Sequence, residues 1–172
     1  HPTIRLSDYQ TIRLSDYQTI RLSDSMTHPS LRPARESESS QIRELIHSVG
    51  INPLGLDWKR FIVAVNDRDE MIGCGQLKPH GKDILELASL AVYPEHRGTG
   101  VARAIIEHML ANSPRPLYLT CRSSLGVLYE KFGFVGVPYE EMPRYFQRIS
   151  RLANLFFKLA AVNEHLLVMK LQ

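Results

Sequence analysis

Apolar positions recur along this chain in two spacings, and each spacing predicts one type of element. Short apolar runs bounded by polar turns predict strands, at residues 30–34, 60–65, 71–77, 84–93, 117–121, 134–137 and 166–171. Apolar residues three and four positions apart predict helices, at residues 39–49, 101–110, 125–132 and 143–161. A hairpin series followed by strand, loop and helix is the order of an α+β fold.

The segment from Ile84 to Leu110 is the part around which we interpret the rest. A predicted buried strand with one carboxylate, Glu86, ends before Pro94, and the short basic loop Arg97-Gly98-Thr99-Gly100 leads into a helix at Val101. The unpaired N–H groups of a helix's first turn suit a phosphate, and glycine lets a ligand approach the backbone. The sequence therefore predicts an anion cradle, although the spacing fits neither a Walker loop nor a dinucleotide fingerprint.

Two motifs in this chain resemble those of a known family. The stretch LAVYPEHRGTGVA (Leu90–Ala102) resembles the acetyl-CoA-binding motif of the GNAT superfamily of N-acyltransferases, and LYEKFGF (Leu128–Phe134) resembles that family's later motif. The resemblance implies an α+β GNAT fold, with a mixed, mostly antiparallel sheet whose fourth and fifth strands splay at a bulge near Leu90–Val92. The helix over residues 143–161 is then an addition before the last strand. The implied acetyl-CoA-binding residues are Leu90, Ala91, Val92, Arg97, Gly98, Thr99, Gly100, Val101 and Ala102.

The resemblance implies an N-acetyltransferase that works by direct attack in a ternary complex, and such a reaction needs a base. An alkylamine with a pKa of about 10.4 is neutral in only about one molecule in two thousand at pH 7. Glu86 is the candidate, because Glu86–Ala91 resembles the E-x-x-x-C-A pattern that carries the general base of histone acetyltransferases. The alternative is a carboxylate that only hydrogen-bonds the sheet edge or a loop.

Tyr129 is the second catalytic candidate. It matches the tyrosine of the family's Y-x-K-x-G-F motif, whose hydroxyl lies near the sulfur and is placed to protonate the departing thiolate. Tyr129 also lies on the apolar face of its helix, so a packing role is the alternative.

The alternative to an enzyme is a non-catalytic protein, a CoA-binding sensor or interaction module. Arg122 stands where the family often has asparagine, which leaves the pantetheine and acceptor contacts there open.

The composition and charge of the chain limit the classes of ligand and partner that we expect. The net charge of +3 favours anionic ligands without implying nucleic acid, and no stretch approaches the ~20 apolar residues of a membrane span. We therefore expect a cytoplasmic protein that acts on a small-molecule or peptide amine, with no nucleic-acid or membrane partner, and a homodimer stays open. His80 falls in a predicted turn and His96 in the loop of the predicted anion cradle, and no pair of histidines has metal-ligand spacing, so no metal is expected.

The two cysteines, Cys74 and Cys121, each fall in a predicted strand. In the family's sheet these strands flank the central one, about two strand spacings or roughly 9–10 Å apart, whereas a disulfide needs Cα atoms within about 7 Å. We therefore expect two free, buried thiols, as is usual in a reducing compartment. A nucleophilic Cys121 is disfavoured because no histidine is placed in the sequence to activate it.

Residues 3–18 are two identical copies of TIRLSDYQ, and TIRLSD follows at residues 19–24, shortly before Met26. Because natural repeats drift, we interpret residues 1–25 as a repeated, tag-like segment and residues 26–172 as the acetyltransferase domain. The alternative is a natural strand arm. We expect the arm to be held by a sheet edge or a cleft.

Three further details are expected from the side chains. Ser37 or Ser39 is predicted to cap the first helix. Trp58 either lines the acceptor site or closes the core. The helix over residues 143–161 is predicted to pack by an apolar stripe and to present a basic face, which is either solvated or beside the acceptor. The stripe consists of Tyr145, Ile149, Leu152, Phe156 and Leu159, and the basic face of Arg144, Arg148, Arg151 and Lys158.

Overall fold

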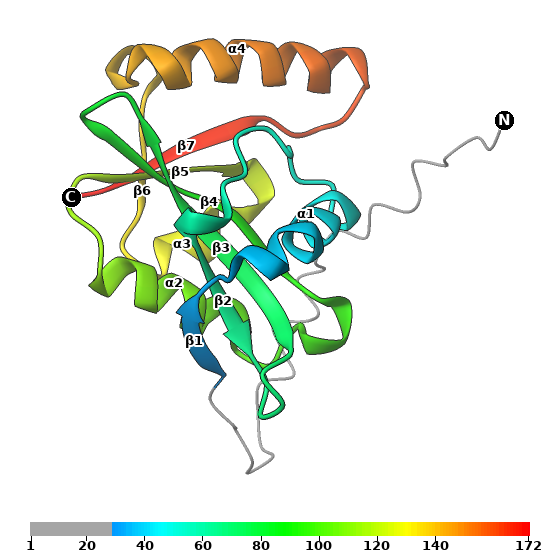
Figure 1. The fold of residues 1–172 in the computed structure, drawn as a ribbon. Coiled ribbons are helices and arrows are strands. Elements are labelled where there is room, and N and C mark those ends of the chain that lie inside the picture. Colours follow the sequence, from blue (N-terminus) through cyan, green and yellow to red (C-terminus); the bar gives the residue numbers. More distant parts are fainter. Residues whose placement is uncertain (1–28) are drawn as a thin grey trace, which may run out of the picture. The chain divides into compact units, whose positions relative to one another are not determined.

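A computed structural model describes residues 29–172 of the chain (Figure 1), so the expectations for residues 1–25 lie outside the described part. Its seven strands form one mixed sheet in the order β1-β2-β3-β4-β5-β7-β6, which confirms the predicted fold class. The strands are β1 (Ser30–Pro33), β2 (Phe61–Val65), β3 (Met71–His80), β4 (Ile84–Val92), β5 (Leu117–Arg122), β6 (Val135–Gly136) and β7 (Leu166–Leu171). The helices are α1 (Ser39–Ser48), α2 (Val101–Ala111), α3 (Gly126–Glu130) and α4 (Arg144–Leu159).

The described chain folds as two compact units, and neither is continuous in sequence. The first unit contains the chain up to Gln76 together with Ser89–His108, and the second contains Leu77–Ala88 together with Met109–Gln172. Strands β3 and β4 and helix α2 each have residues in both units. The two units are described separately below.

In the first unit, α1 packs against the hairpin of β2 and β3. The predicted apolar face of α1 is confirmed, since Ile42, Leu45 and Ile46 are buried against side chains that include Phe61 and Cys74. The other side of β3 meets α2 closely. A Cβ placed on Gly73 would lie 2.9 Å from a methyl carbon of Val101, so glycine is required for this packing.

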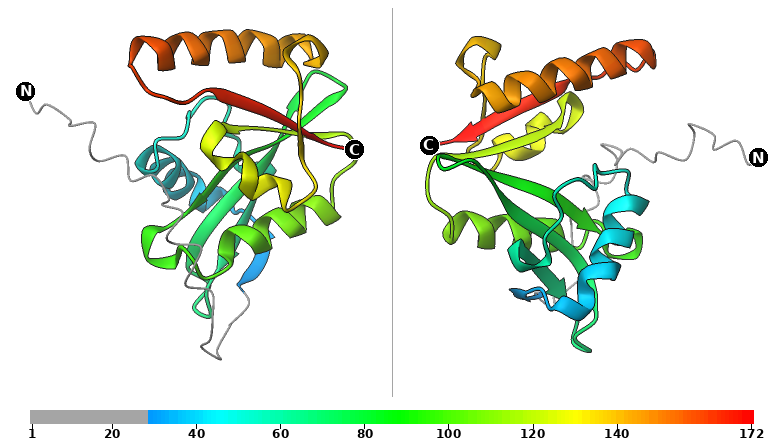
Figure 2. Two further views of the ribbon diagram at one scale, coloured as in Figure 1. Left: turned by 180° about the vertical axis from the view of Figure 1, so that it is seen from behind. Right: turned by 45° about the horizontal axis from the view of Figure 1, so that its top comes forward.

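In the second unit, β5 pairs antiparallel with β7 along its whole length, and α4 lies over β7 (Figures 1 and 2). The core beneath α4 contains Phe146, Tyr118 and Val168. The predicted helix is confirmed, but its predicted packing face is only partly correct. Phe146 and Ser150 are the buried residues, whereas three members of the predicted stripe are 67% to 79% exposed, namely Leu152, Phe156 and Leu159.

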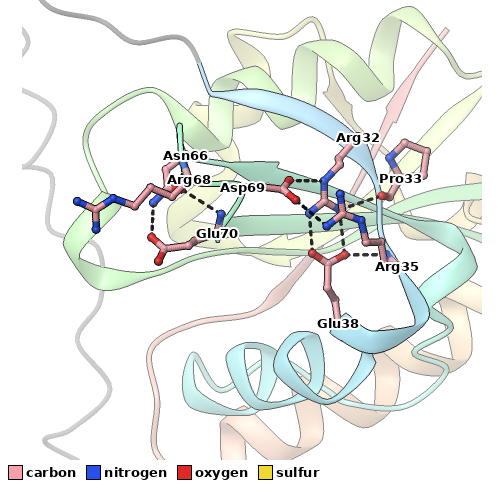
Figure 3. A network of polar contacts seen from close by, with 8 residues as sticks. All are labelled: Arg32, Pro33, Arg35, Glu38, Asn66, Arg68, Asp69 and Glu70. Carbon is pink, nitrogen blue, oxygen red and sulfur yellow. Dashed lines mark hydrogen bonds and ion pairs between the residues drawn. The ribbon is translucent and has the colours of Figure 1, made fainter.

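A network of charged side chains joins β1 to the hairpin turn and to the start of α1 (Figure 3). The guanidinium of Arg32 donates two hydrogen bonds to Glu38, at 2.8 and 3.0 Å, and its Nε donates to Asp69 at 2.9 Å. Arg35 donates to the other oxygen of Asp69 at 2.6 Å. Glu38 also accepts the backbone N–H of Arg35, at the start of a 3-10 turn (Glu36–Glu38) that precedes α1. Neither predicted serine cap forms, because Glu38 is the residue before α1 and no side chain caps that helix.

This network predicts a pH dependence of stability. The hydrogen bonds from Arg32 hold the pKa of Glu38 below its usual value, and those from Arg35 and Arg32 do the same for Asp69. A carboxyl whose pKa is lower in the folded state than in the unfolded state stabilises the folded state at pH values above the unfolded pKa. This contribution is lost as the pH falls through the folded pKa. We therefore expect the urea midpoint to fall as the pH is lowered from about 6 to about 3.

The variant Arg32→Gln tests the cause. It should be less stable than wild type near neutral pH and should lose less stability on acidification, because Glu38 loses the main cause of its lowered pKa and Asp69 loses one of its two arginine partners. Arg43→Gln, at an exposed position of α1, is the matched control and should follow wild type. An unchanged pH dependence in Arg32→Gln would contradict the assignment.

Within residues 29–172, every helix is too short or too polar to cross a membrane.

Candidate active site

The loop that connects β4 to α2 belongs to the first unit and has the predicted backbone. A 3-10 turn at Pro94–His96 ends the strand, and the loop from Arg97 to Gly100 is exposed. Gly98 and Gly100 have φ angles of 77° and 90°, a left-handed conformation that residues with a Cβ rarely adopt. The two glycines are therefore required by the turn that delivers the chain into α2.

The amides of this loop are largely available for a ligand. Arg97 uses its backbone N–H internally, on the carbonyl of Pro94 at 3.3 Å, and its Nε donates to the carbonyl of Val92. The amides of Gly98–Ala102 make no hydrogen bond to any residue of the described part of the chain. Free amides at a helix N-terminus, next to an arginine, suit a diphosphate.

The strand before this loop is distorted, one residue earlier than predicted. Ser89 has a φ angle of 53°, whereas the bulge was expected at Leu90–Val92. The Ser89 hydroxyl accepts a hydrogen bond from the side-chain amide of Gln76 at 2.9 Å, which holds the bend from the neighbouring strand. The pairing of β4 with β5 covers only Leu85–Leu87 against Leu117–Leu119, which confirms the predicted splayed pair.

Glu86, in the second unit, is a buried carboxylate with a partner at each oxygen. Its Oε2 lies 2.6 Å from Nε2 of His80, and its Oε1 accepts the Thr120 hydroxyl at 2.7 Å. The side chains of His80 and Glu86 are only 9% and 6% exposed. The prediction that His80 lies in a turn is wrong, because β3 continues three residues beyond the predicted end and includes it.

Helix α4 contributes aromatic rings to the same cluster. The ring of Tyr145 stacks on that of His80 with centroids 3.8 Å apart, and Phe146 meets His80 edge-on at 5.9 Å. Burial and the nearby charge of Glu86 raise the pKa of Tyr145, so its hydroxyl stays protonated at neutral pH. Helix α4 therefore packs directly on the histidine that contacts Glu86.

Tyr129 lies in α3, also within the second unit. It is 8% exposed and meets Phe134 edge-on, with ring centroids 6.2 Å apart. The contact with Phe134 shows that Tyr129 contributes to packing, as the alternative interpretation states. Packing of the ring does not prevent the Tyr129 hydroxyl from donating a proton.

Both cysteines are free and buried, as predicted. Burial raises the pKa of the Cys74 thiol to about 12, and burial together with the charge of Glu164 does the same for Cys121. Neither thiol is therefore ionised at neutral pH, which disfavours an acyl-enzyme on Cys121. Within residues 29–172, no group of three or more His, Cys, Asp or Glu side chains is arranged to hold a metal.

Four residues that contact the candidate site were not predicted to belong to it. Gln76 and Thr120 had no predicted role, His80 was placed in a turn, and Tyr145 was placed in the apolar stripe of the helix over residues 143–161. A signal existed for His80, since Leu77 and Pro79 alternate with polar residues and continue the period of β3. Proline is uncommon inside a strand, however, so Pro79 weakens this signal. Thr120 lies in a correctly predicted strand, but nothing in the sequence around it indicates that its hydroxyl contacts Glu86.

Comparisons with known proteins bear on this site. Residues 57–136 match the family model described as an acetyltransferase (GNAT) domain. No curated protein matches the sequence.

Solved structures have a similar fold. N-acetylglutamate synthase from Neisseria gonorrhoeae, complexed with coenzyme A and L-arginine, is 21% identical with a TM-score of 0.62 over 81% of this chain, which spans only 32% of that protein. Rv2747 from Mycobacterium tuberculosis, in complex with CoA and NLQ, is 21% identical with a TM-score of 0.62, over 84% of this chain and 100% of its own. Escherichia coli ElaA is 18% identical with a TM-score of 0.55, and the match covers 84% of this chain and 99% of ElaA.

Proposed function

We propose that this chain is an acetyl-CoA-dependent acyltransferase of the GNAT superfamily, and that it transfers the acetyl group of acetyl-CoA to a primary amine by direct attack in a ternary complex. The observation that carries the proposal is the span of the family match. Residues 57–136 include both the loop with free amides and the two proton-transfer candidates, Glu86 and Tyr129.

We assign the binding of acetyl-CoA to β4 and the loop that follows it. The amides of Gly98–Ala102 and the charge of Arg97 bind the diphosphate, and backbone groups of Leu90–Val92 bind the pantetheine and the acetyl carbonyl. Two features support this assignment, namely the unused amides at the start of α2 and the distortion of β4 at Ser89. Backbone donors held in place before the reaction stabilise the developing oxyanion most effectively.

The proton transfers are assigned to the second unit. Glu86 takes a proton from the acceptor ammonium, and the neutral nitrogen attacks the thioester carbonyl. As the tetrahedral intermediate collapses, the C–S bond breaks and the thiolate takes a proton from the Tyr129 hydroxyl, while the nitrogen, which became positively charged on attack, loses a second proton that returns Tyr129 to its neutral form. A carboxylate that already has a donor at each oxygen still has about two lone-pair sites left to receive a proton, so the observed contacts of Glu86 are compatible with this role.

The acceptor is assigned to amines of low molecular mass, and amino acids are the first to test. Support comes from similar folds, since the N-acetylglutamate synthase structures hold coenzyme A with L-arginine or with N-acetyl-glutamate. Because these proteins are only 21% to 22% identical to this chain, the similarity suggests a class of acceptor and not a particular one.

The direct test measures coenzyme A release from acetyl-CoA with a thiol reagent, over a panel of amino acids, polyamines and lysine-containing peptides. We expect amine-dependent release above the hydrolysis background, together with a mass increase of one acetyl group on the acceptor. If acetyl-CoA binds but no amine is consumed, the result would favour the non-catalytic CoA-binding module.

Replacing the tyrosine hydroxyl tests the general acid. We expect Tyr129→Phe to lower kcat by about 10-fold to 100-fold with little change in KM for acetyl-CoA, because the ring contact with Phe134 remains while the proton donor is lost. Tyr139→Phe is the matched control, since the Tyr139 hydroxyl makes no hydrogen bond within the described residues. Steady-state kinetics with the best acceptor decides, and unchanged turnover in Tyr129→Phe would exclude the assignment.

A further inference from the structure

His80 has contacts that a surface histidine lacks, and the proposed mechanism does not yet use them. It is the last residue of β3, its side chain is 9% exposed, and its Nε2 contacts the Glu86 carboxylate at 2.6 Å. A distance this short is characteristic of a hydrogen bond with charge on at least one partner. The two residues therefore interact strongly in a place from which water is largely excluded.

The two partners of Glu86 together fix its carboxylate. His80 contacts Oε2 from β3, and Thr120 donates to Oε1 from β5. Because the two contacts come from different strands, rotation about the last side-chain bond of Glu86 would break both. The carboxylate is thus held in one orientation before any substrate binds, which is the condition for efficient proton transfer.

His80 is itself held by α4. Tyr145 stacks on one face of the imidazole, with an angle of 24° between the ring planes, and Phe146 packs against its edge. The stack fixes the plane of the ring and so the direction of the Nε2–H bond. The helix that interrupts the family's usual connection before the last strand therefore acts on the carboxylate through His80.

We propose that His80 is a positioning residue for the transferase reaction, which donates Nε2–H to Glu86 and, held by Tyr145, fixes the carboxylate in the orientation that accepts the proton of the amine. This inference rests on the proposed function. His80 acts through Glu86 and does not touch the reacting atoms.

Kinetics of three variants test the role. His80→Phe keeps an aromatic ring against Tyr145 but removes the donor, and we expect kcat to fall about 10-fold to 100-fold while KM for acetyl-CoA stays unchanged. His80→Gln restores an N–H donor and should recover part of the loss. His47→Phe, at an exposed position in α1, is the matched control and should behave like wild type.

A double variant separates positioning from a general structural role. If His80 acts through Glu86, then adding His80→Phe to Glu86→Gln should cause little further loss of kcat, whereas independent roles would multiply the two losses. An unchanged kcat in His80→Phe, or a multiplied loss in the double variant, would overturn the inference. No turnover in wild type with any amine would instead count against the transferase function itself.

A measurement that needs no turnover keeps the inference testable even if the His80 variants fold poorly. With ¹⁵N-labelled histidine, the NMR spectrum of the wild-type protein should show the His80 proton on Nε2, and the Nε2 signal should shift in Glu86→Gln. If the proton is found only on Nδ1, or if the Nε2 signal is the same in Glu86→Gln as in wild type, the inferred hydrogen bond does not exist. Either result would refute the positioning role.

Discussion

Glu86→Gln is expected to lower kcat by about 100-fold to 10,000-fold, the range typical of a lost general base. Glutamine has nearly the shape of glutamate and can still accept the Thr120 hydroxyl, so the fold and the KM for acetyl-CoA should change little. It cannot, however, take a proton from the acceptor. Steady-state kinetics at pH 7 with the best acceptor measures the loss.

The pH dependence of the variant gives an internal check. Without a base, the rate depends on the fraction of amine that is already neutral, which rises about tenfold for each pH unit below the amine's pKa. The residual rate of Glu86→Gln should therefore climb with pH more steeply than that of wild type. Glu44→Gln, at an exposed position of α1, is the matched control. If Glu86→Gln kept wild-type turnover at pH 7, Glu86 would be only a structural carboxylate.

Phe146→Ala is expected to destabilise the protein by about 3 to 5 kcal/mol, the usual cost of removing a fully buried phenylalanine. The ring is wholly buried beneath α4, where it packs against Tyr118, Tyr145 and His80. Its loss would leave a cavity that the rigid sheet below cannot fill. Because the same ring packs against His80, activity should fall as well. Urea unfolding followed by circular dichroism measures the change in stability.

The same helix supplies a control with the same chemistry. Phe156 is 67% exposed, so Phe156→Ala removes an equal number of atoms from a position that buries little surface. We expect a change of at most about 1 kcal/mol. If Phe156→Ala destabilised the protein as much as Phe146→Ala, then α4 would be packed by its other face.

Much of the fold was predictable because it depends on local patterns. The apolar run of β4, the glycine loop and the periodicity of α2 are consecutive in sequence, and each has a distinct physical signature. The loop residues Gly98 and Gly100 were identified for the same reason, since their backbone conformation has a direct residue preference. The glycine loop and the start of α2 could therefore be predicted without a structure, and the use of this loop as an anion cradle stays a prediction.

The parts that were missed depend on which side chains meet in space. The serine caps failed because a 3-10 turn at Glu36–Glu38 precedes α1, and Arg32, on a preceding strand, binds the Glu38 side chain that closes this turn. The packing face of α4 was misjudged because its buried residues, Phe146 and Ser150, lie on a face offset from the most apolar stripe. In these two cases a tertiary contact overrides a local preference. His80 is a different case, since it belongs to β3 because the strand continues past Pro79.

The interleaving of the two units limits how such a protein can be recombined. The chain passes from one unit to the other after Gln76, after Ala88 and after His108. Expression of either unit alone would therefore require two separate gene segments to be joined, and a single truncation would always leave one unit incomplete. A chimera that takes its α4-containing unit from a relative would need residues 77–88 and 109–172 to be transplanted together, because Glu86 and Thr120 come from different segments of the same unit.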